Sequence, residues 1–502
     1  MKKLISLLLV ALMAFGLMAS ASAELLGPGN VTLHRLSVNV GFDVNADLNA
    51  ENYKKTTGYD VVYYSMPAKD YDRKVILDLG SGSATYDIVK CTMNTWRLLV
   101  SNNLLMPLND LLPVYGQKIL GGASQEAWDA VTLEDGTIYG MPAMYPYDEE
   151  ITTFMVCRMD LMRAAGIDKV PETIDEFYDD LVALKKFYGD QYIIFCGPYM
   201  PATEGGTSNW VIPKTIACAF GIYNDWMVDE NGKVIYMTEA PGFTDMVAFL
   251  TKLHDEGLID DDWAVNTDSA VNEKLSSGKA IIACSNRSGV QMTTPAQMQL
   301  LGLDWDDLGY IGALKGTKYQ TKYMETDQIS NVICIPRTAA HPEDALNYIS
   351  NVIDNQLFLN LGEEGVHWYY DENHRFVPIN PIFSDERGNS YWYNDSLNWA
   401  DWKFQWPTRI RKSEAQWAAF EAVTINGDPS VFVKSEFKFM PATEAYTENN
   451  TALYKSLQDF ILQVMSGART IDDLAAYQKE WANNEGEAVR AELQTYYDGL
   501  AK

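Results

Sequence analysis

The sequence predicts an α/β protein of two or more domains, and three observations carry that prediction. Strand and helix patterns alternate from residue 31 onward, as they do in α/β folds. About 479 of the 502 residues remain after a predicted N-terminal export signal, which is too long a chain for one hydrophobic core. No long Gly/Ser linker interrupts the chain, so we expect several short connections between the domains.

The first half of the chain supplies most of the strand signals. Short runs rich in valine, isoleucine and tyrosine predict strands, and the apolar positions Val75, Ile76 and Leu79 predict a helix. The predicted strands are 31–40, 60–66, 85–89, 135–142 and 152–158, with one helix ending at Gly58 and another at 70–79.

The later helices have recognisable starts. Thr173 and Glu176 form a capping box ahead of a helix whose apolar face carries Ile174, Phe177, Leu181 and Leu184. Pro342 starts another helix, where its missing N–H costs nothing, and Ala345, Leu346, Ile349 and Val352 form its apolar face. Residues 229–233 predict a turn between two short strands, and Thr470 predicts the start of a late helix with Leu474, Tyr477 and Trp481.

The first 23 residues have the pattern of a cleavable export signal. Lys2 and Lys3 precede an apolar run at 4–18, and the small residues Ala21-Ser22-Ala23 form a cleavage pattern. The run is too short for a membrane span, and no cysteine follows it that could carry a lipid anchor. We therefore expect a periplasmic or secreted protein without a membrane anchor.

The composition narrows the function classes. The net charge of −29, which becomes −31 without Lys2 and Lys3, repels phosphate backbones and argues against nucleic acid as a partner. The chain has 13 Trp, 29 Tyr and 18 Phe, and aromatic faces bind sugar rings as well as filling cores. The even count of six cysteines permits disulfides, but each lies in or beside an apolar stretch, which favours buried free thiols.

Catalytic motifs are missing from the sequence. It contains no H-E-x-x-H, G-x-x-x-x-G-K-[ST] or G-x-S-x-G pattern, and its five histidines lack metal-ligand spacing. The acidic runs at 148–150 and 260–262 could hold the acid pair of a glycosidase, although such runs are usually solvated faces. We expect no metal, no cofactor and no catalysis.

Several segments, taken in order, resemble one family across nearly the whole mature chain. That family is the family 1 extracellular solute-binding proteins of ABC importers, of the carbohydrate-binding type. The resemblance rests on DGTIYGMP (135–142), CRMDLMRAAGIDKVPETIDEFYDDL (157–181), DEGLIDDD (255–262), LGEEGVHWYYDE (361–372) and the C-terminal helices. The subgroup that is most similar includes Gram-positive lipoproteins and alginate-binding proteins, but the lipobox cysteine and the acidic calcium loop of those members are absent here.

The resemblance implies a two-lobe periplasmic binding protein fold of type II, with the ligand in a cleft between hinged lobes. The expected crossings between the lobes lie near 144–150 and 324–330. The expected organisation is a signal peptide at 1–23, a first lobe at 24–146 and 328–383, and a second lobe at 147–327 and 384–502.

Candidate ligand-binding residues follow the predicted strands or the first crossing, because segments after a parallel strand's carboxyl end commonly line such a cleft. They are Lys90, Thr92, Asn94 and Trp96 after the strand at 85–89, Tyr145 and Tyr147 at the first crossing, and Asn209, Trp210, Asn286 and Arg287.

The densest aromatic segment, 391–407, adds Trp399 and Trp402 to these candidates. Trp399, Trp402 and Trp406 have the spacing of one helix face. Two interpretations stay open: the helix packs into a core, or at least one ring lines the cleft and stacks on a sugar. Trp368 is expected to be structural.

The sequence thus predicts a monomeric exported protein that captures an oligosaccharide and delivers it to an ABC permease. The alternatives are a secreted glycosidase or lyase, a glycan-presenting sensor or adhesion module, and a binding protein for peptides or another polar solute.

Overall fold

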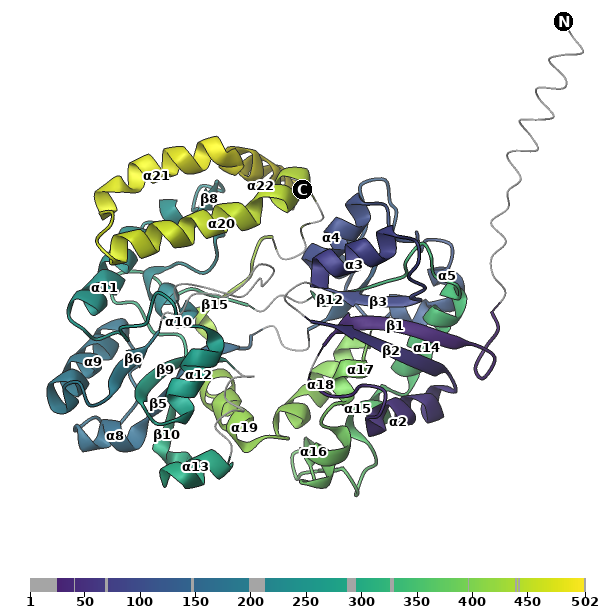
Figure 1. The fold of residues 1–502 in the computed structure, drawn as a ribbon, viewed down its shortest axis with the longest axis horizontal. Coiled ribbons are helices and arrows are strands. Elements are labelled where there is room, and N and C mark those ends of the chain that lie inside the picture. The colour runs from purple at the N-terminus through teal and green to yellow at the C-terminus, as the bar shows by residue number, and fades with distance from the viewer. Residues whose placement is uncertain are drawn as a thin grey trace, which may run out of the picture.

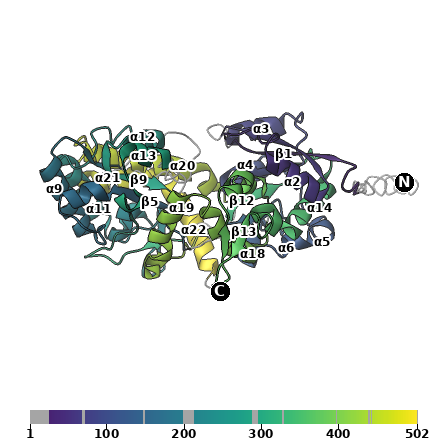
Figure 2. The ribbon, with the colours of Figure 1, turned by 90° about the horizontal axis from the view of Figure 1, so that it is seen from below.

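The computed structural model describes residues 25–39, 41–67, 71–145, 149–197, 213–286, 295–325, 329–395, 397–437, 440 and 443–500. The predicted export signal lies outside these ranges. The described chain forms two α/β lobes side by side, each built on its own sheet (Figures 1 and 2).

The first lobe is built on a five-stranded sheet in the order β2-β1-β3-β12-β4. β1 is parallel to β2 and β3, whereas β12 is antiparallel to β3 and β4. The strands are β1 (Thr32–Val38), β2 (Asp60–Met66), β3 (Ile88–Cys91), β4 (Met141–Met144) and β12 (Ile329–Cys334). The predicted strand at 135–142 therefore begins later, at Met141.

Helices from both halves of the sequence cover this sheet (Figure 1). They are α2 (Leu48–Thr57), α3 (Tyr71–Gly80), α4 (Met93–Ser101), α5 (Leu112–Tyr115), α6 (Gln117–Leu120), α7 (Gln125–Ala130), α14 (Pro342–Asp354), α15 (Gln356–Leu361), α16 (Ile382–Arg387), α17 (Ser390–Tyr393) and α18 (Trp399–Ile410). A hairpin of β13 (Trp368–Tyr370) and β14 (Phe376–Pro378) completes the lobe, and Trp368 is buried as predicted.

The second lobe is built on a four-stranded sheet in the order β10-β5-β9-β6. Its strands are β5 (Thr153–Arg158), β6 (Ile193–Cys196), β9 (Ala280–Asn286) and β10 (Leu308–Ile311), with a separate hairpin of β7 (Trp226–Val228) and β8 (Val234–Tyr236) around the predicted turn. Its helices are α8 (Met159–Ala164), α9 (Ile174–Tyr188), α10 (Lys214–Ala217), α11 (Phe243–Asp255), α12 (Asp268–Ser276), α13 (Pro295–Leu301), α20 (Glu444–Met465), α21 (Leu474–Trp481) and α22 (Glu487–Leu500).

The helix starts follow the local signals in the sequence. Thr173 caps α9 by accepting from the amide of Glu176, whose carboxylate accepts in return from the amide of Thr173. The four predicted apolar residues of α9 are all buried, and so are the four of α14. These predictions are confirmed because both the caps and the apolar faces depend on neighbouring residues alone.

Within the described ranges, three connections pass between the lobes. The chain crosses from β4 to β5, and it returns from β11 (Tyr323–Met324) to β12. The third crossing runs through α19 (Glu414–Phe420), which lies between the two sheets in both views (Figures 1 and 2), to β15 (Phe432–Val433), which pairs with β11. The sequence predicted the first two crossings and missed the third.

The predicted lobe boundary at residue 384 is wrong for the segment that follows it. Trp392, Trp402 and Ile410 belong to the apolar core around the first sheet, not to the second lobe. An ion pair explains the placement, because Arg35 Nε on β1 donates to Asp395 Oδ1 at 2.8 Å and both side chains are fully buried. Arg35 Nη2 also donates to the carbonyl of Trp392, so the segment is fastened to the first lobe.

All six cysteines are buried free thiols, as the sequence favoured. Cys91 and Cys334 come closest, with their sulfurs 3.7 Å apart on the paired strands β3 and β12. Burial raises the pKa of the Cys91 thiol, so it stays protonated and packs as a small apolar group.

We predict that Asp395→Asn lowers the free energy of unfolding by about 3–5 kcal/mol, because it leaves the buried Arg35 cation without its counter-ion. Urea denaturation measures the change. Asp60→Asn is the matched control: Asp60 pairs with Lys54 at 3.1 Å in solvent, so its loss should cost less than about 1 kcal/mol. Equal costs for the two variants would show that the buried pair does not hold the segment.

Candidate ligand-binding site

The register of the two sheets brings several strand ends to one place between the lobes. In the first lobe, β4 ends at one crossing and β12 begins at another. Because β12 is antiparallel to β3, the carboxyl end of β3 at Cys91 lies beside the start of β12 and therefore beside these crossings. In the second lobe β5 begins at a crossing and pairs antiparallel with β9, with Thr153 opposite Asn286. The carboxyl ends of β3 and β9 therefore both point to this region, which we call the junction.

On the first lobe, three predicted residues lie at the carboxyl end of β3 or directly after it. Thr92 is half-buried and caps α4, because its Oγ1 accepts from the amide of Thr95. Asn94 lies half-exposed in the first turn of the same helix. Lys90 is buried, and its Nζ donates to the carbonyl of Asn394 and lies 5.5 Å from the ring centroid of Tyr391.

Aromatic rings from α17, α18 and the first crossing form the wall beside Lys90. The rings of Tyr391 and Trp402 are stacked, with centroids 5.8 Å apart and planes at 8°. Trp406 contacts both of these rings, and Tyr145 packs against Trp406 at 5.7 Å. Trp399 is half-buried at the start of α18, and its Nε1 donates to the carbonyl of Tyr145 at 2.9 Å.

A buried carboxylate fixes this wall to the first crossing. Glu150 is 1% exposed, and its Oε2 accepts from the hydroxyl of Tyr145 and from Nε1 of Trp406, each at 3.1 Å. The interpretation of the acidic runs as solvated faces is therefore wrong for Glu150, and also for buried Asp260, which pairs with Lys274 at 2.6 Å. A charge in the interior needs such donors, which an acidic run in sequence does not reveal.

On the second lobe, Asn286 is half-buried at the end of β9. Opposite it, Thr153 exchanges a hydrogen bond with the hydroxyl of Tyr323 at 3.1 Å, which links the start of β5 to the crossing strand β11. Four predicted residues lie outside the described ranges: Tyr147, Asn209, Trp210 and Arg287.

Two predicted ligand contacts are corrected by burial. Trp96 is fully buried in the core of the first lobe, and Trp402 is 1% exposed with one ring face covered by Tyr391. Neither ring presents a free face to a sugar in this conformation. Trp96 was predicted to contact the ligand because it follows β3. It does not, because α4 begins at Met93 and turns Trp96 inward to the core.

Tyr391 and Glu150 also belong to this wall, although neither was predicted as a site residue. The dense aromatic segment at 391–407 could have indicated Tyr391. Its position beside Lys90, however, depends on the pair of Arg35 and Asp395, which are more than 300 residues apart in sequence.

Within the described ranges, no group of three or more His, Cys, Asp or Glu could hold a metal ion. No helix of that same part of the chain is long and apolar enough to cross a membrane.

Two α/β lobes, three crossings, and aromatic and polar side chains where the crossings meet define a two-lobed binding protein. The profile of the bacterial extracellular solute-binding proteins matches residues 44–356, which is more than half of the chain. The chain therefore belongs to the bacterial extracellular solute-binding protein family. Its members are binding proteins, and the family supports an extracellular or periplasmic location.

Curated relatives are similar at low identity. The lipoprotein LipO of Bacillus subtilis is 26% identical over 325 residues, which cover 62% of each chain. The polygalacturonan/rhamnogalacturonan-binding protein YtcQ of the same species is 23% identical over 262 residues, 48% of each chain. The alignment thus spans less than two thirds of these two relatives.

Solved structures share the fold over nearly the whole length. The ABC-transporter substrate-binding protein FusA of Streptococcus pneumoniae, in complex with kestose, has a TM-score of 0.71 at 17% identity and covers 94% of this chain and 99% of its own. The alginate-binding protein AlgQ2, without calcium ion, has a TM-score of 0.68 at 17% identity, with coverages of 95% and 99%. The predicted two-lobe fold is confirmed by these similarities.

The environment of Lys90 generates a pH prediction. Burial lowers the pKa of Lys90 from 10.5 to about 7, with Arg35 adding to the shift and Asp395 opposing it. The unfolded chain keeps this proton up to about pH 10, so the free energy of unfolding should rise with pH between about 7 and 10, by about 2–5 kcal/mol. Lys90→Met should remove that rise, measured as urea midpoints at pH 6.5, 8 and 9.5.

The control for this prediction is Lys479→Met, because Lys479 is exposed on α21 of the second lobe. This variant should keep the wild-type dependence on pH. A Lys90→Met protein whose stability rises with pH as steeply as the wild type would contradict the assignment to Lys90.

Proposed function

We propose that the protein is an exported binding protein that captures an oligosaccharide at the junction and delivers it to an ABC permease without catalysis. It acts as a monomer, free in the periplasm or secreted, after removal of residues 1–23. Closure of the lobes follows from ligand contacts on both of them, because a ligand shifts a two-state equilibrium only by its differential affinity for the two states.

The observation that carries this proposal is the half-buried aromatic wall at the junction. Trp399 and Tyr391 keep part of their surface accessible, and the polar side chains of Thr92 and Asn94, which follow β3 on the same lobe, are also only half-buried. A sugar ring offers an apolar C–H face to an aromatic ring and hydroxyls to amides and hydroxyls, so this combination fits a carbohydrate. FusA and AlgQ2, described with kestose and as alginate-binding, support the same class of ligand.

Hinge closure is supported by the way the three crossings are built. The first two crossings are short, and the second and third pair with each other through β11 and β15. Short segments that join two separately packed bodies are the usual site of hinge motion. The two sheets have their own apolar cores, so each lobe can move as a rigid unit.

The two tryptophans of α18 give the sharpest test of the site. Trp399→Ala should weaken sugar binding at least tenfold with little change in melting temperature, because the ring is half-buried at the edge of the core. Trp402→Ala should instead lower the free energy of unfolding by about 3–5 kcal/mol, because the ring is 1% exposed inside the core. Calorimetric titration and urea denaturation measure the two effects. Unchanged affinity in the Trp399→Ala protein would exclude this ring from the site.

The ligand class is tested by melting Glu24–Lys502 with neutral and acidic oligosaccharides and with short peptides. A ligand at about 100 times its dissociation constant should raise the free energy of unfolding by roughly 2.7 kcal/mol. The expected result is stabilisation by one class of sugar, recovery of that sugar intact, and a smaller radius of gyration in X-ray scattering. Recovery of cleaved sugar would show that the protein is an enzyme. Stabilisation by peptides alone would contradict the oligosaccharide ligand and favour a peptide-binding protein.

A further inference from the structure

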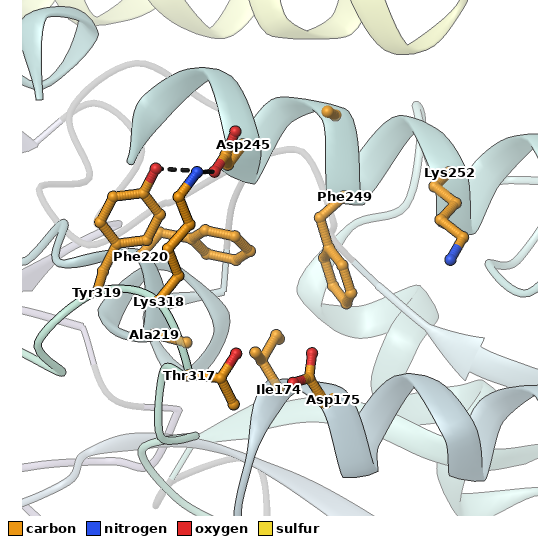
Figure 3. A pocket seen from close by; sticks show the side chains of 11 residues that line it. Ile174, Asp175, Ala219, Phe220, Asp245, Phe249, Lys252, Thr317, Lys318 and Tyr319 are labelled. Carbon is orange, nitrogen blue, oxygen red and sulfur yellow. Dashed lines mark hydrogen bonds and ion pairs between the residues drawn. The ribbon is translucent and has the colours of Figure 1, made fainter. Parts of the chain in front are cut away.

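A cavity lies in the second lobe, apart from the junction. It has a volume of about 270 Å³ and lies between the start of α9, the middle of α11 and the loop at 317–319 (Figure 3). α9 and α11 are on the side of this lobe that faces away from the first lobe (Figures 1 and 2). None of the residues that line it belongs to the junction.

One side of this groove is aromatic. Phe249 reaches from α11 across the groove toward Ile174 and Asp175 on α9 (Figure 3). Phe220 lies behind it, with ring centroids 5.8 Å apart, and Tyr319 follows at 6.3 Å from Phe220. Phe249 is half-buried, so the groove offers an aromatic surface to a ring of matching size.

The rim of the groove is polar and balanced in charge. Asp245 is ion-paired with Lys318 at 2.6 Å and accepts from the hydroxyl of Tyr319 at 2.7 Å, and these bonds lower its pKa. Lys252 lies 3.5 Å from the ring centroid of Tyr178, at the other end. Asp175 is exposed and makes no hydrogen bond to the described residues.

We propose that this groove binds one ring of a neutral sugar. Two carboxylates and two ammonium groups on the rim give no net preference for an anion or a cation, so a neutral ligand fits best. The ring face of Phe249 stacks on the C–H face of the sugar, while Asp175 accepts hydrogen bonds from its hydroxyls and the exposed Thr317 adds a donor and an acceptor. The volume lies just below the range of about 300–1,000 Å³ that is usual for ligand pockets, so the groove has room for a single ring only.

This site does not rest on the proposed function, because its residues are distinct from those of the junction. The test therefore needs a local reporter. Ile174 lines the groove, so its methyl resonance in the full chain labelled with ¹³C-methyl isoleucine, assigned with Ile174→Val, reports on ligand in the groove. The probes are the methyl glycosides of glucose, galactose and mannose, each titrated separately.

We expect the Ile174 resonance to shift and saturate with at least one glycoside. Ala248→Trp, which fills the groove without removing a packed side chain, should abolish the shift. Asp175→Asn should weaken binding about tenfold, whereas the matched control Asp179→Asn, exposed one turn further along α9, should leave it unchanged.

Two results would overturn the proposal: no shift of Ile174 with any of the three glycosides, or a shift that persists in Ala248→Trp. If the shift of the Ile174 resonance saturates in the Trp399→Ala protein as it does in the wild type, ligand binding in the groove is independent of the junction. A wild-type protein that binds glycosides in the groove but no oligosaccharide at the junction would count against the proposed function alone.

Discussion

The buried pair of Arg35 and Asp395 determines where the aromatic wall of the junction lies. The pair joins β1, at the start of the described chain, to the segment between α17 and α18. Tyr391 in α17 and Trp399 at the start of α18 flank that segment, and its Asn394 carbonyl accepts from Lys90. Two charges taken out of water tolerate little displacement, because either one left unpaired in the interior is costly. The pair thus holds the wall on the first lobe, against the carboxyl end of β3.

The three crossings give the second constraint, since they decide how the lobes can move. α19 contributes to both cores: Phe420 packs in the first, and Ala415 and Ala419 pack in the second. Ile151 in the first crossing donates its amide to Thr424, just beyond α19, at 3.3 Å. The crossings are therefore joined to one another, and a motion of one lobe must bend all of them together. The hinge closure proposed above would therefore be a rotation about the junction rather than a separation of the lobes.

Features that depend on neighbouring residues were predictable from the sequence. The capping box of α9, the apolar faces of α9 and α14, and the turn between β7 and β8 all form where the local pattern indicates. The strand end that carries Lys90, Thr92 and Asn94 could be located from residue alternation, and the crossing that carries Tyr145 followed from the family resemblance. Asn286 likewise lies at a strand end, that of β9.

The sequence by itself determined the α/β class, the family and the strand ends that form the junction, since these follow from periodicity and motif order. The tertiary structure alone decided which aromatic rings face outward. Trp399 and Trp402 are three residues apart on one helix, yet one is half-buried and the other is covered by Tyr391. Tertiary structure also assigned residues 390–410 to the first lobe, because Arg35 and Asp395 meet across 360 positions of sequence. Periodicity identifies which side of a helix is apolar, but burial depends on the partner that packs against it.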